Sequence, residues 1–325
     1  MKTLTPMPGG ASTRQFVRVA LRDGASAVAM FVPGEGRPEE SVHDLSARPR
    51  WPFLEVRDLL EARGVRVPKL LGEDCAHGWL LVEDLGDDTL AARIAAHPAE
   101  RAALYTLAAQ GLARAQSALR ELPDGSVVRG RGFDAALLLW ELEHFREWGL
   151  DARGHKLSRE DRASFESIAQ RLAARIGSWP RSFTHRDYQS RNLMVASGQL
   201  VWIDFQDALL GPRVYDMVAL LQDSYQEFDA PFIDARLGEY ADAADLGPDE
   251  RAVLRTEFDL VTVQRKLKDA GRFVFIERVK GNPSFLPYID PSLRKVRAAL
   301  ERLAPHDRDL AELGAILHRA LPDVM

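Results

Sequence analysis

The spacing of the apolar residues changes near residue 89, and this change constrains the fold more than any other feature of the sequence. Between Val17 and Leu21 apolar residues alternate with polar or small ones, and the turn Asp23-Gly24 leads into a second apolar run, which is typical of a β-hairpin. After Thr89 apolar residues recur every three to five positions, as a buried helical face requires. The sequence therefore predicts an α+β protein with a small β-rich lobe, residues 1–85, and a large helical lobe, residues 86–325.

Further elements are expected within each lobe. In the first lobe a helix is expected over 53–63, ending at Gly64, with short strands over 67–71 and 79–82. The second lobe should contain helices over 133–148, 159–176 and about 250–278, with a strand-rich island over 183–204. A cleft between two lobes is the usual place for a ligand.

Composition and charge exclude several classes of protein. The 325 residues carry a net charge of −5, so nucleic-acid binding driven by bulk positive charge is not expected. The single cysteine, Cys75, cannot form an internal disulfide or a multi-cysteine metal site, which favours a reducing cytoplasm. No apolar run is long enough for a membrane span, and residues 1–10 do not resemble a signal peptide, so we expect no membrane association.

The strand-rich island contains a set of residues suited to phosphoryl transfer. His185 and Asp187 form a His-x-Asp pair, Asn192 follows, and Asp204 ends the apolar run 200–203. Phosphoryl transfer needs one carboxylate to accept the proton of the acceptor hydroxyl and hard oxygen ligands for Mg²⁺. We therefore assign Asp187 as the base and Asn192 and Asp204 as the metal ligands.

A simpler interpretation of the same residues stays open at this point. Three fixed positions arise by chance in a chain this long, and Asp and Asn in polar loops are commonly turn formers. The run 201–205 favours the catalytic interpretation, because an apolar strand tolerates an acid such as Asp204 only at its end. His185 is expected to support the loop by hydrogen bonding, since no second histidine lies at metal-ligand spacing.

The sequence resembles the aminoglycoside-phosphotransferase-like small-molecule kinases, and more closely the bacterial kinases that phosphorylate N-acetylmuramate and N-acetylglucosamine at the C1 hydroxyl. The segments that carry the resemblance are 9–16, 183–195, 204–212, 215–225 and 264–268. The resemblance implies a two-lobed protein-kinase-like fold, ATP and Mg²⁺ as cofactors, and a small-molecule sugar substrate from cell-wall recycling. We also expect a monomer.

One departure from the family concerns the lysine that usually holds the α and β phosphates from the third strand. The matching strand contains no lysine, and Met30 takes its place. Arg14, Arg18 and the backbone N–H groups of the turn from Gly9 to Ser12 are the alternatives for phosphate binding. We assign Ser12 and Arg14; for Arg18 a solvent-facing strand position is the simpler interpretation.

The segment between the lobes is expected to bind the adenine. The backbone at Glu83 and Leu85 would offer the base one acceptor and one donor. Without the kinase context, the same segment reads as a strand end followed by a turn.

The sugar contacts are the least constrained part of the sequence. The expected helix over 133–148 carries Glu141 among aromatic residues, although aromatic residues at helical spacing are more often core. Asp207 follows Asp204 closely, and Arg265 would suit a muramyl lactate carboxylate because arginine binds carboxylates in a bidentate manner. We assign Glu141, Asp207 and Arg265 to the sugar.

Two other functions stay open. One is another small-molecule kinase of the superfamily, acting on an aminoglycoside or a choline-type alcohol. The other is a catalytically silent nucleotide-binding protein, which the missing strand lysine would suggest and which the joint presence of Asp187, Asn192 and Asp204 opposes.

Overall fold

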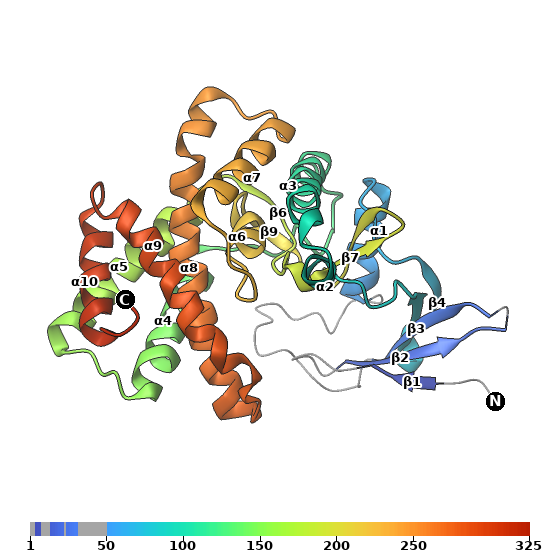
Figure 1. Cartoon of the computed structure of the whole chain (residues 1–325), viewed down its shortest axis with the longest axis horizontal. Coiled ribbons are helices and arrows are strands. Elements are labelled where there is room, and N and C mark those ends of the chain that lie inside the picture. Colours follow the sequence, from blue (N-terminus) through green and yellow to red (C-terminus); the bar gives the residue numbers. More distant parts are fainter. Residues whose placement is uncertain (1–3, 8–13, 23, 32–50) are drawn as a thin grey trace.

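The computed structural model describes the whole chain except residues 1–3, 8–13, 23 and 32–50. Its N-terminal part is a five-stranded antiparallel sheet with the strand order β1-β2-β3-β5-β4 (Figure 1). The strands are β1 (Leu4–Pro6), β2 (Gln15–Ala20), β3 (Ser26–Phe31), β4 (Leu70–Asp74) and β5 (Trp79–Glu83). The β2–β3 pair confirms the predicted hairpin.

Helix α1 (Pro52–Ala62) connects the sheet to the rest of the molecule and confirms the helix expected over 53–63. One part of its buried face packs Leu54 with Met30 in a small core cluster of the N-terminal lobe. Val56 and Leu60 instead belong to the main core, which continues through the helical lobe. The two lobes therefore share apolar packing through α1.

Strand β4 begins later than predicted. The sequence placed a strand over 67–71, whereas β4 spans Leu70–Asp74. Pro68 has no N–H to donate to a strand ladder, and its carbonyl oxygen accepts a hydrogen bond from Arg57 Nε at 2.9 Å. The segment around Pro68 is thus held by α1 before the chain enters the sheet.

The C-terminal part is mainly helical (Figure 1). Its α-helices are α2 (Leu90–Ala96), α3 (Arg101–Ala118), α4 (Ala135–His144), α5 (Arg159–Gly177), α6 (Tyr215–Leu221), α7 (Ala230–Ala243), α8 (Pro248–Lys280), α9 (Ile289–Leu303) and α10 (Arg308–Ala320). Shorter helical turns are η1 (Cys75–His77), η2 (Pro98–Glu100), the π-helical η3 (Phe145–Leu150), η4 (Asp151–Arg153), η5 (Ser190–Asn192) and η6 (Pro283–Tyr288). The helices expected over 133–148, 159–176 and 250–278 correspond to α4 with η3, to α5 and to α8.

Two short hairpins form the strand-rich island inside this lobe. Strand β6 (Arg181–Thr184) pairs with β9 (Leu209–Pro212), and β7 (Leu193–Ala196) pairs with β8 (Gln199–Trp202), both in antiparallel fashion. The β7–β8 hairpin is tied to the N-terminal side by main-chain hydrogen bonds: Trp202 N donates to Arg66 O and Val195 N donates to Asp88 O. These bonds fix the island at the junction of the two lobes.

The junction itself lies between β5, which ends at Glu83, and α2, which begins at Leu90. The predicted lobe boundary at residues 85 and 86 falls between these two elements and stays a prediction. Within the part of the chain that the structure describes, no helix is both long and apolar enough to span a membrane.

Candidate active site

The loop that carries Asp187 leaves β6 through a strained backbone. Arg186 has φ 79°, in the left-handed region that residues with a side chain rarely adopt. Asp216 of α6 holds this conformation, because its carboxylate accepts the N–H groups of His185 at 2.6 Å and Arg186 at 3.0 Å. Burial raises the pKa of Asp216 to about 7, although these two hydrogen bonds and Arg265 act in the opposite direction.

Asp187 itself is partly open to solvent, with 41% of its side chain exposed. Arg265 lies behind it, with Nη2 3.5 Å from Asp187 Oδ1 and Nη1 donating to Arg186 O at 2.9 Å. Burial favours the neutral acid, but the charges of Arg265, Lys268 and Arg186 outweigh it and lower the pKa of Asp187. Asp187 is therefore a carboxylate at neutral pH, as a base that accepts a hydroxyl proton must be.

His185 supports the loop from inside. The ring is fully buried, and its Nε2 lies 3.1 Å from Ile203 O. A carbonyl oxygen accepts only, so Nε2 carries the proton. Burial lowers the pKa of His185 to about 4, which keeps the ring neutral. These contacts are those of the supporting histidine that the sequence predicts.

Asn192 and Asp204 come together at the start and the end of the β7–β8 hairpin. Asn192 Nδ2 donates to Asp187 O at 2.8 Å, and Ile203 N donates to Asn192 O at 3.1 Å. Asp204 follows β8 with φ 63°. Partial desolvation and the neighbouring Asp187 raise the pKa of Asp204, whose side chain is 47% exposed. An amide oxygen and a carboxylate at the two ends of one hairpin, with a second carboxylate near enough to raise the pKa of Asp204, are a donor set that fits a hard divalent cation.

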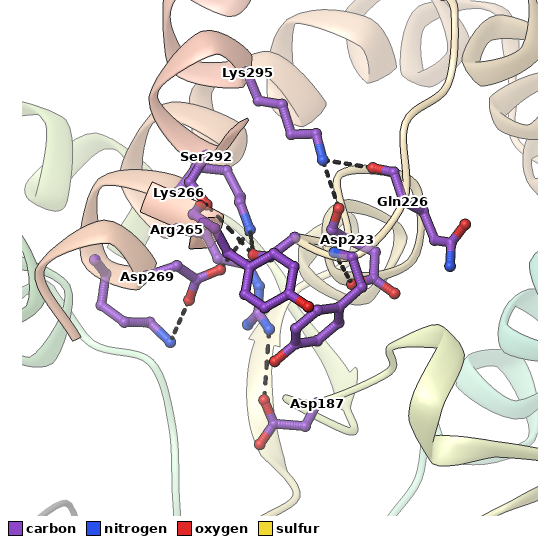
Figure 2. Close-up of polar contacts among 12 residues, drawn as sticks. Asp187, Asp223, Gln226, Arg265, Lys266, Asp269, Ser292 and Lys295 are labelled. Carbon is purple, nitrogen blue, oxygen red and sulfur yellow. Dashed lines mark hydrogen bonds and ion pairs between the residues drawn. The ribbon is translucent and has the colours of Figure 1, made fainter. Parts of the chain in front are cut away.

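A second buried acid anchors the other end of the catalytic loop. Asp223 Oδ2 accepts from Ser190 N at 3.0 Å and from Ser190 Oγ at 2.5 Å. Lys295 of α9 donates to the carbonyl oxygens of Asp223 at 2.5 Å and Gln226 at 2.7 Å (Figure 2). Asp216 and Asp223 thus hold the loop at both ends, and the sequence analysis assigned neither. Both lie in the segment 215–225 that carries the family resemblance, and this resemblance was the signal in the sequence that could have identified them.

A cluster of charged side chains on α8 continues from Arg265 behind this anchor (Figure 2). Lys266 Nζ donates to Ser224 Oγ at 2.6 Å and to Asp269 Oδ2 at 2.7 Å. Burial lowers the pKa of Lys266, while Lys266, Lys268 and Arg265 together lower the pKa of Asp269, against its burial. The catalytic loop therefore rests on a buried network in which lysine and arginine side chains alternate with carboxylates.

The residues predicted for the nucleotide have different surroundings. The carboxylate of Glu83 binds Arg66 Nη2 at 2.6 and 2.7 Å and accepts from Lys69 N at 3.0 Å, which fixes the end of β5 just before Leu85. Ser12 lies outside the described residues. Arg14 approaches the acids that follow β8, with Nη1 3.6 Å from Asp204 Oδ1.

The strand position that usually carries a lysine holds a buried methionine. Met30 is 2% exposed and packs in the small N-terminal core cluster. Arg18, the other alternative for phosphate binding, pairs through Nε with Asp84 Oδ2 at 2.7 Å and through Nη2 with Asp87 Oδ1 at 2.9 Å. Arg18 therefore holds the segment between the lobes.

The three residues assigned to the sugar are not brought together on one surface. Glu141 is 1% exposed and accepts from Gln264 Nε2 at 2.7 Å. Arg265 is equally buried, with its guanidinium toward Asp187 and 4.6 Å above the Tyr215 ring. Asp207 has 43% of its side chain exposed beside Asp204. Only Asp207 is open to a ligand without rearrangement.

The fold and this arrangement define a kinase-like phosphotransferase of small molecules. The chain belongs to the phosphotransferase enzyme family (APH), whose sequence pattern matches residues 3–254. This membership confirms the family resemblance and the two-lobed α+β fold expected from the sequence.

Comparisons with individual proteins agree with this membership. The chain is 33% identical over 320 residues to the N-acetylmuramate/N-acetylglucosamine kinase of Pseudomonas aeruginosa, covering 97% of this chain and 87% of the relative. It is 31% identical over 329 residues to the protein of the same name from Neisseria meningitidis serogroup B, covering 98% and 91%. The choline kinase of Cryptosporidium parvum superposes with a TM-score of 0.62 over 97% of this chain and 92% of that one, at 10% identity, which shows a common fold.

Proposed function

We propose that this protein transfers the γ-phosphoryl group of ATP to the anomeric C1 hydroxyl of N-acetylmuramate or N-acetylglucosamine, in the recycling of cell-wall sugars. The observation that carries the proposal is the similarity along 97% of the chain to a relative named for both sugars. A likeness limited to one lobe would support only the nucleotide half of the reaction. Here it includes the helical lobe, where the acceptor would bind.

Asp187 is the proposed base. An anomeric hydroxyl is more acidic than an ordinary alcohol, so a carboxylate of modest basicity suffices to take its proton. The C1 oxygen forms the new bond to the γ-phosphorus, the bond from that phosphorus to the β–γ bridging oxygen breaks, and the C1 hydroxyl proton passes to Asp187. Arg265 and Asp216 hold the carboxylate in place from behind.

Asn192 and Asp204 are the proposed ligands of Mg²⁺. When bound, the metal would neutralise the charge on the phosphates. Asn192 has a second function that needs no metal, because its side-chain amide donates to Asp187 O and so links the metal-binding position to the base.

ATP is the co-substrate that the family implies, and we propose that it lies between the lobes with its adenine against the backbone of Glu83 and Leu85. The phosphates would face Ser12 and Arg14 from the lobe of residues 1–85, and Asp187 from the lobe of residues 86–325. Asp207 is the proposed sugar contact that its exposure favours, whereas Glu141 and Arg265 would act from buried positions.

Since Asp187, Asn192 and Asp204 gather within a single chain, we propose that a monomer is active, and that it acts in the cytoplasm where ATP is available.

The test is a panel of acceptors with the full-length protein, ATP and Mg²⁺. We expect turnover of N-acetylmuramate or N-acetylglucosamine, with a phosphorus NMR resonance of the product coupled to the C1 proton. Choline and kanamycin should not be phosphorylated. Asp187→Asn, prepared in parallel, excludes a contaminating kinase if its turnover is lost.

Two results would contradict the proposal. Coupling of the phosphorus to the C6 protons would move the reaction to another hydroxyl. Efficient turnover of an aminoglycoside or of choline, without turnover of either amino sugar, would assign the protein to another branch of the family.

A further inference from the structure

Arg14 lies against two carboxylates at the place proposed for the metal. Its Nη1 is 3.6 Å from Asp204 Oδ1 and its Nη2 is 3.9 Å from Asp207 Oδ2. Gln206 Nε2 donates to the same pair of acids, at 2.9 Å to Asp204 Oδ1 and 3.0 Å to Asp207 Oδ2. The two carboxylates are thus bridged by an amide and approached by one guanidinium.

This contact joins the two lobes. Arg14 stands directly before β2 of the N-terminal sheet, whereas Asp204 and Asp207 follow β8 of the helical lobe. Nearby, the rings of Phe53 on α1 and Phe205 stack with centroids 5.0 Å apart. The guanidinium reaches the acids from the side of the sheet, which is also the side of the proposed nucleotide site.

The geometry is that of a long ion pair. Both distances exceed the range of a charge-assisted hydrogen bond. The two acids keep 47% and 43% of their side chains exposed, whereas the Arg14 side chain is 19% exposed, so solvent reaches the pair from the side of the acids. A divalent cation that bound Asp204 would compete directly with the guanidinium for Asp204 Oδ1.

The N-terminal sheet has few other described cations for the phosphates. Met30 replaces the usual strand lysine and is buried, and Arg18 is held by Asp84 and Asp87. Arg14 lies against Asp204 and is the described arginine nearest to the proposed metal-binding position.

We propose that Arg14 is an exchangeable counter-ion of this site. Without nucleotide it neutralises Asp204 and Asp207; when the metal–nucleotide complex binds, the metal takes over Asp204 and the guanidinium passes to the phosphates, where it does the work of the missing strand lysine. This inference rests on the proposed function for its nucleotide and its metal.

The exchange predicts opposite effects of one substitution in two binding measurements. In Arg14→Gln, Mn²⁺ alone should bind more tightly than in the wild type, by up to about fivefold, because a competing ion pair is removed. The Mg²⁺–ADP complex should bind at least about tenfold more weakly, because a charge-assisted contact to phosphate is lost. Mn²⁺ binding is read by electron paramagnetic resonance and ADP binding by calorimetry, neither of which requires turnover.

Three further variants test whether the two effects come from the guanidinium of Arg14 and the carboxylate of Asp204. Arg22→Gln removes the same charge from an exposed position in the β2–β3 turn and should change neither measurement. Arg14→Lys keeps the charge and should restore most of the competition with Mn²⁺, which also shows that the site tolerates substitution. Asp204→Ala should abolish the Mn²⁺ signal in the wild-type and the Arg14→Gln backgrounds alike.

Only the pair of opposite effects supports the exchange. Weaker ADP binding with unchanged or weaker Mn²⁺ binding would make Arg14 a simple nucleotide ligand and overturn the proposal, as would unchanged ADP binding. Phosphorylation of a different acceptor would contradict the proposed function while leaving these binding results intact. Failure of the wild type to bind nucleotide would contradict both.

Discussion

Asp216 accepts two main-chain N–H groups from the catalytic loop, and replacing it with asparagine tests whether these bonds hold Asp187 in place. The bonds run from His185 at 2.6 Å and from Arg186 at 3.0 Å. An asparagine has nearly the same shape but only one acceptor oxygen, so one of the two N–H groups would face an NH₂ group. The left-handed conformation of Arg186 would then lose one of its two restraints.

The number of N–H groups left without an acceptor sets the expected loss in the free energy of unfolding. A buried N–H left without a partner costs about 1–3 kcal/mol. Burial raises the pKa of Asp216 to about 7, so the ionised carboxylate is itself destabilised and a neutral asparagine recovers part of the loss. We therefore expect Asp216→Asn to lower the free energy of unfolding by about 1–2 kcal/mol, and Asp216→Ala, which removes both acceptors, by about 2–5 kcal/mol. A displacement of the base by about 1 Å would lower kcat on the order of 100-fold.

The loss of stability is measured by urea unfolding followed by tryptophan fluorescence. The loss of activity is measured as kcat, together with the KM for ATP, on the same preparations. Asp124→Asn is the matched control, because Asp124 is almost fully exposed and pairs only with Arg129 among the described residues, so neither quantity should change. The KM for ATP should stay within about threefold, since Asp216 contacts no part of the proposed nucleotide site. A kcat for Asp216→Asn within threefold of the wild type would refute the reasoning.

Three further predictions concern the site itself. Asp187→Asn should lower kcat by orders of magnitude while calorimetry shows nearly unchanged ATP binding; retention of more than about a tenth of the wild-type kcat would count against the base assignment. Asn192→Ala and Asp204→Ala should each weaken Mg²⁺-dependent nucleotide binding, and unchanged Mg²⁺ titrations in both variants would exclude them as ligands. Arg265 lowers the pKa of Asp187, so the wild type should lose activity only when the pH falls below that lowered pKa. In Arg265→Met the pKa of Asp187 should rise, and the acid limb of the kcat/KM profile should move to higher pH. Arg265→Lys keeps the positive charge and should keep most of the wild-type profile. An acid limb that does not move in Arg265→Met would place the charge effect elsewhere.

Elements with a regular apolar period were predictable from the sequence. The β2–β3 hairpin, α1, α5 and α8 all lie where periodicity placed them. Helix α9 carries the same signal, because its buried positions Leu293, Val296 and Leu300 recur at helical spacing. Helix α6 offers no such signal, because all seven of its residues are buried and a helix buried on every side has no apolar stripe.

In the candidate site, the residues predicted from the sequence lie close together along the chain, and the residues that were missed do not. Asp187, Asn192 and Asp204 lie within one loop and one hairpin, so their spacing alone brought them together. Asp216 and Asp223 lie about 30 positions from the groups they hold, and no spacing rule connects them. Glu141 and Arg265 were assigned to the sugar because their charge suits it. The sequence does not report how deeply a single charged residue is buried, and in the structure both are buried, against Gln264 and Asp187.

Arg14 and Arg18 show why a charge missing from one strand need not be missing from the site. An extended chain advances about 3.3 Å per residue and repeats its direction every second residue, so positions four apart face the same side about 13 Å from one another. Arg18 meets the acids between the lobes at Asp84, where the adenine is proposed to bind, and Arg14 meets Asp204, where the metal is proposed to bind. Strand β2 and the residue before it thus place a guanidinium at each end of the proposed nucleotide site. With these two arginines in place, strand β3 needs no lysine for the phosphates, and Met30 packs against Leu54 of α1. A lysine in place of Met30 would then be a buried cation without a described partner, and it should destabilise the N-terminal lobe rather than improve ATP binding.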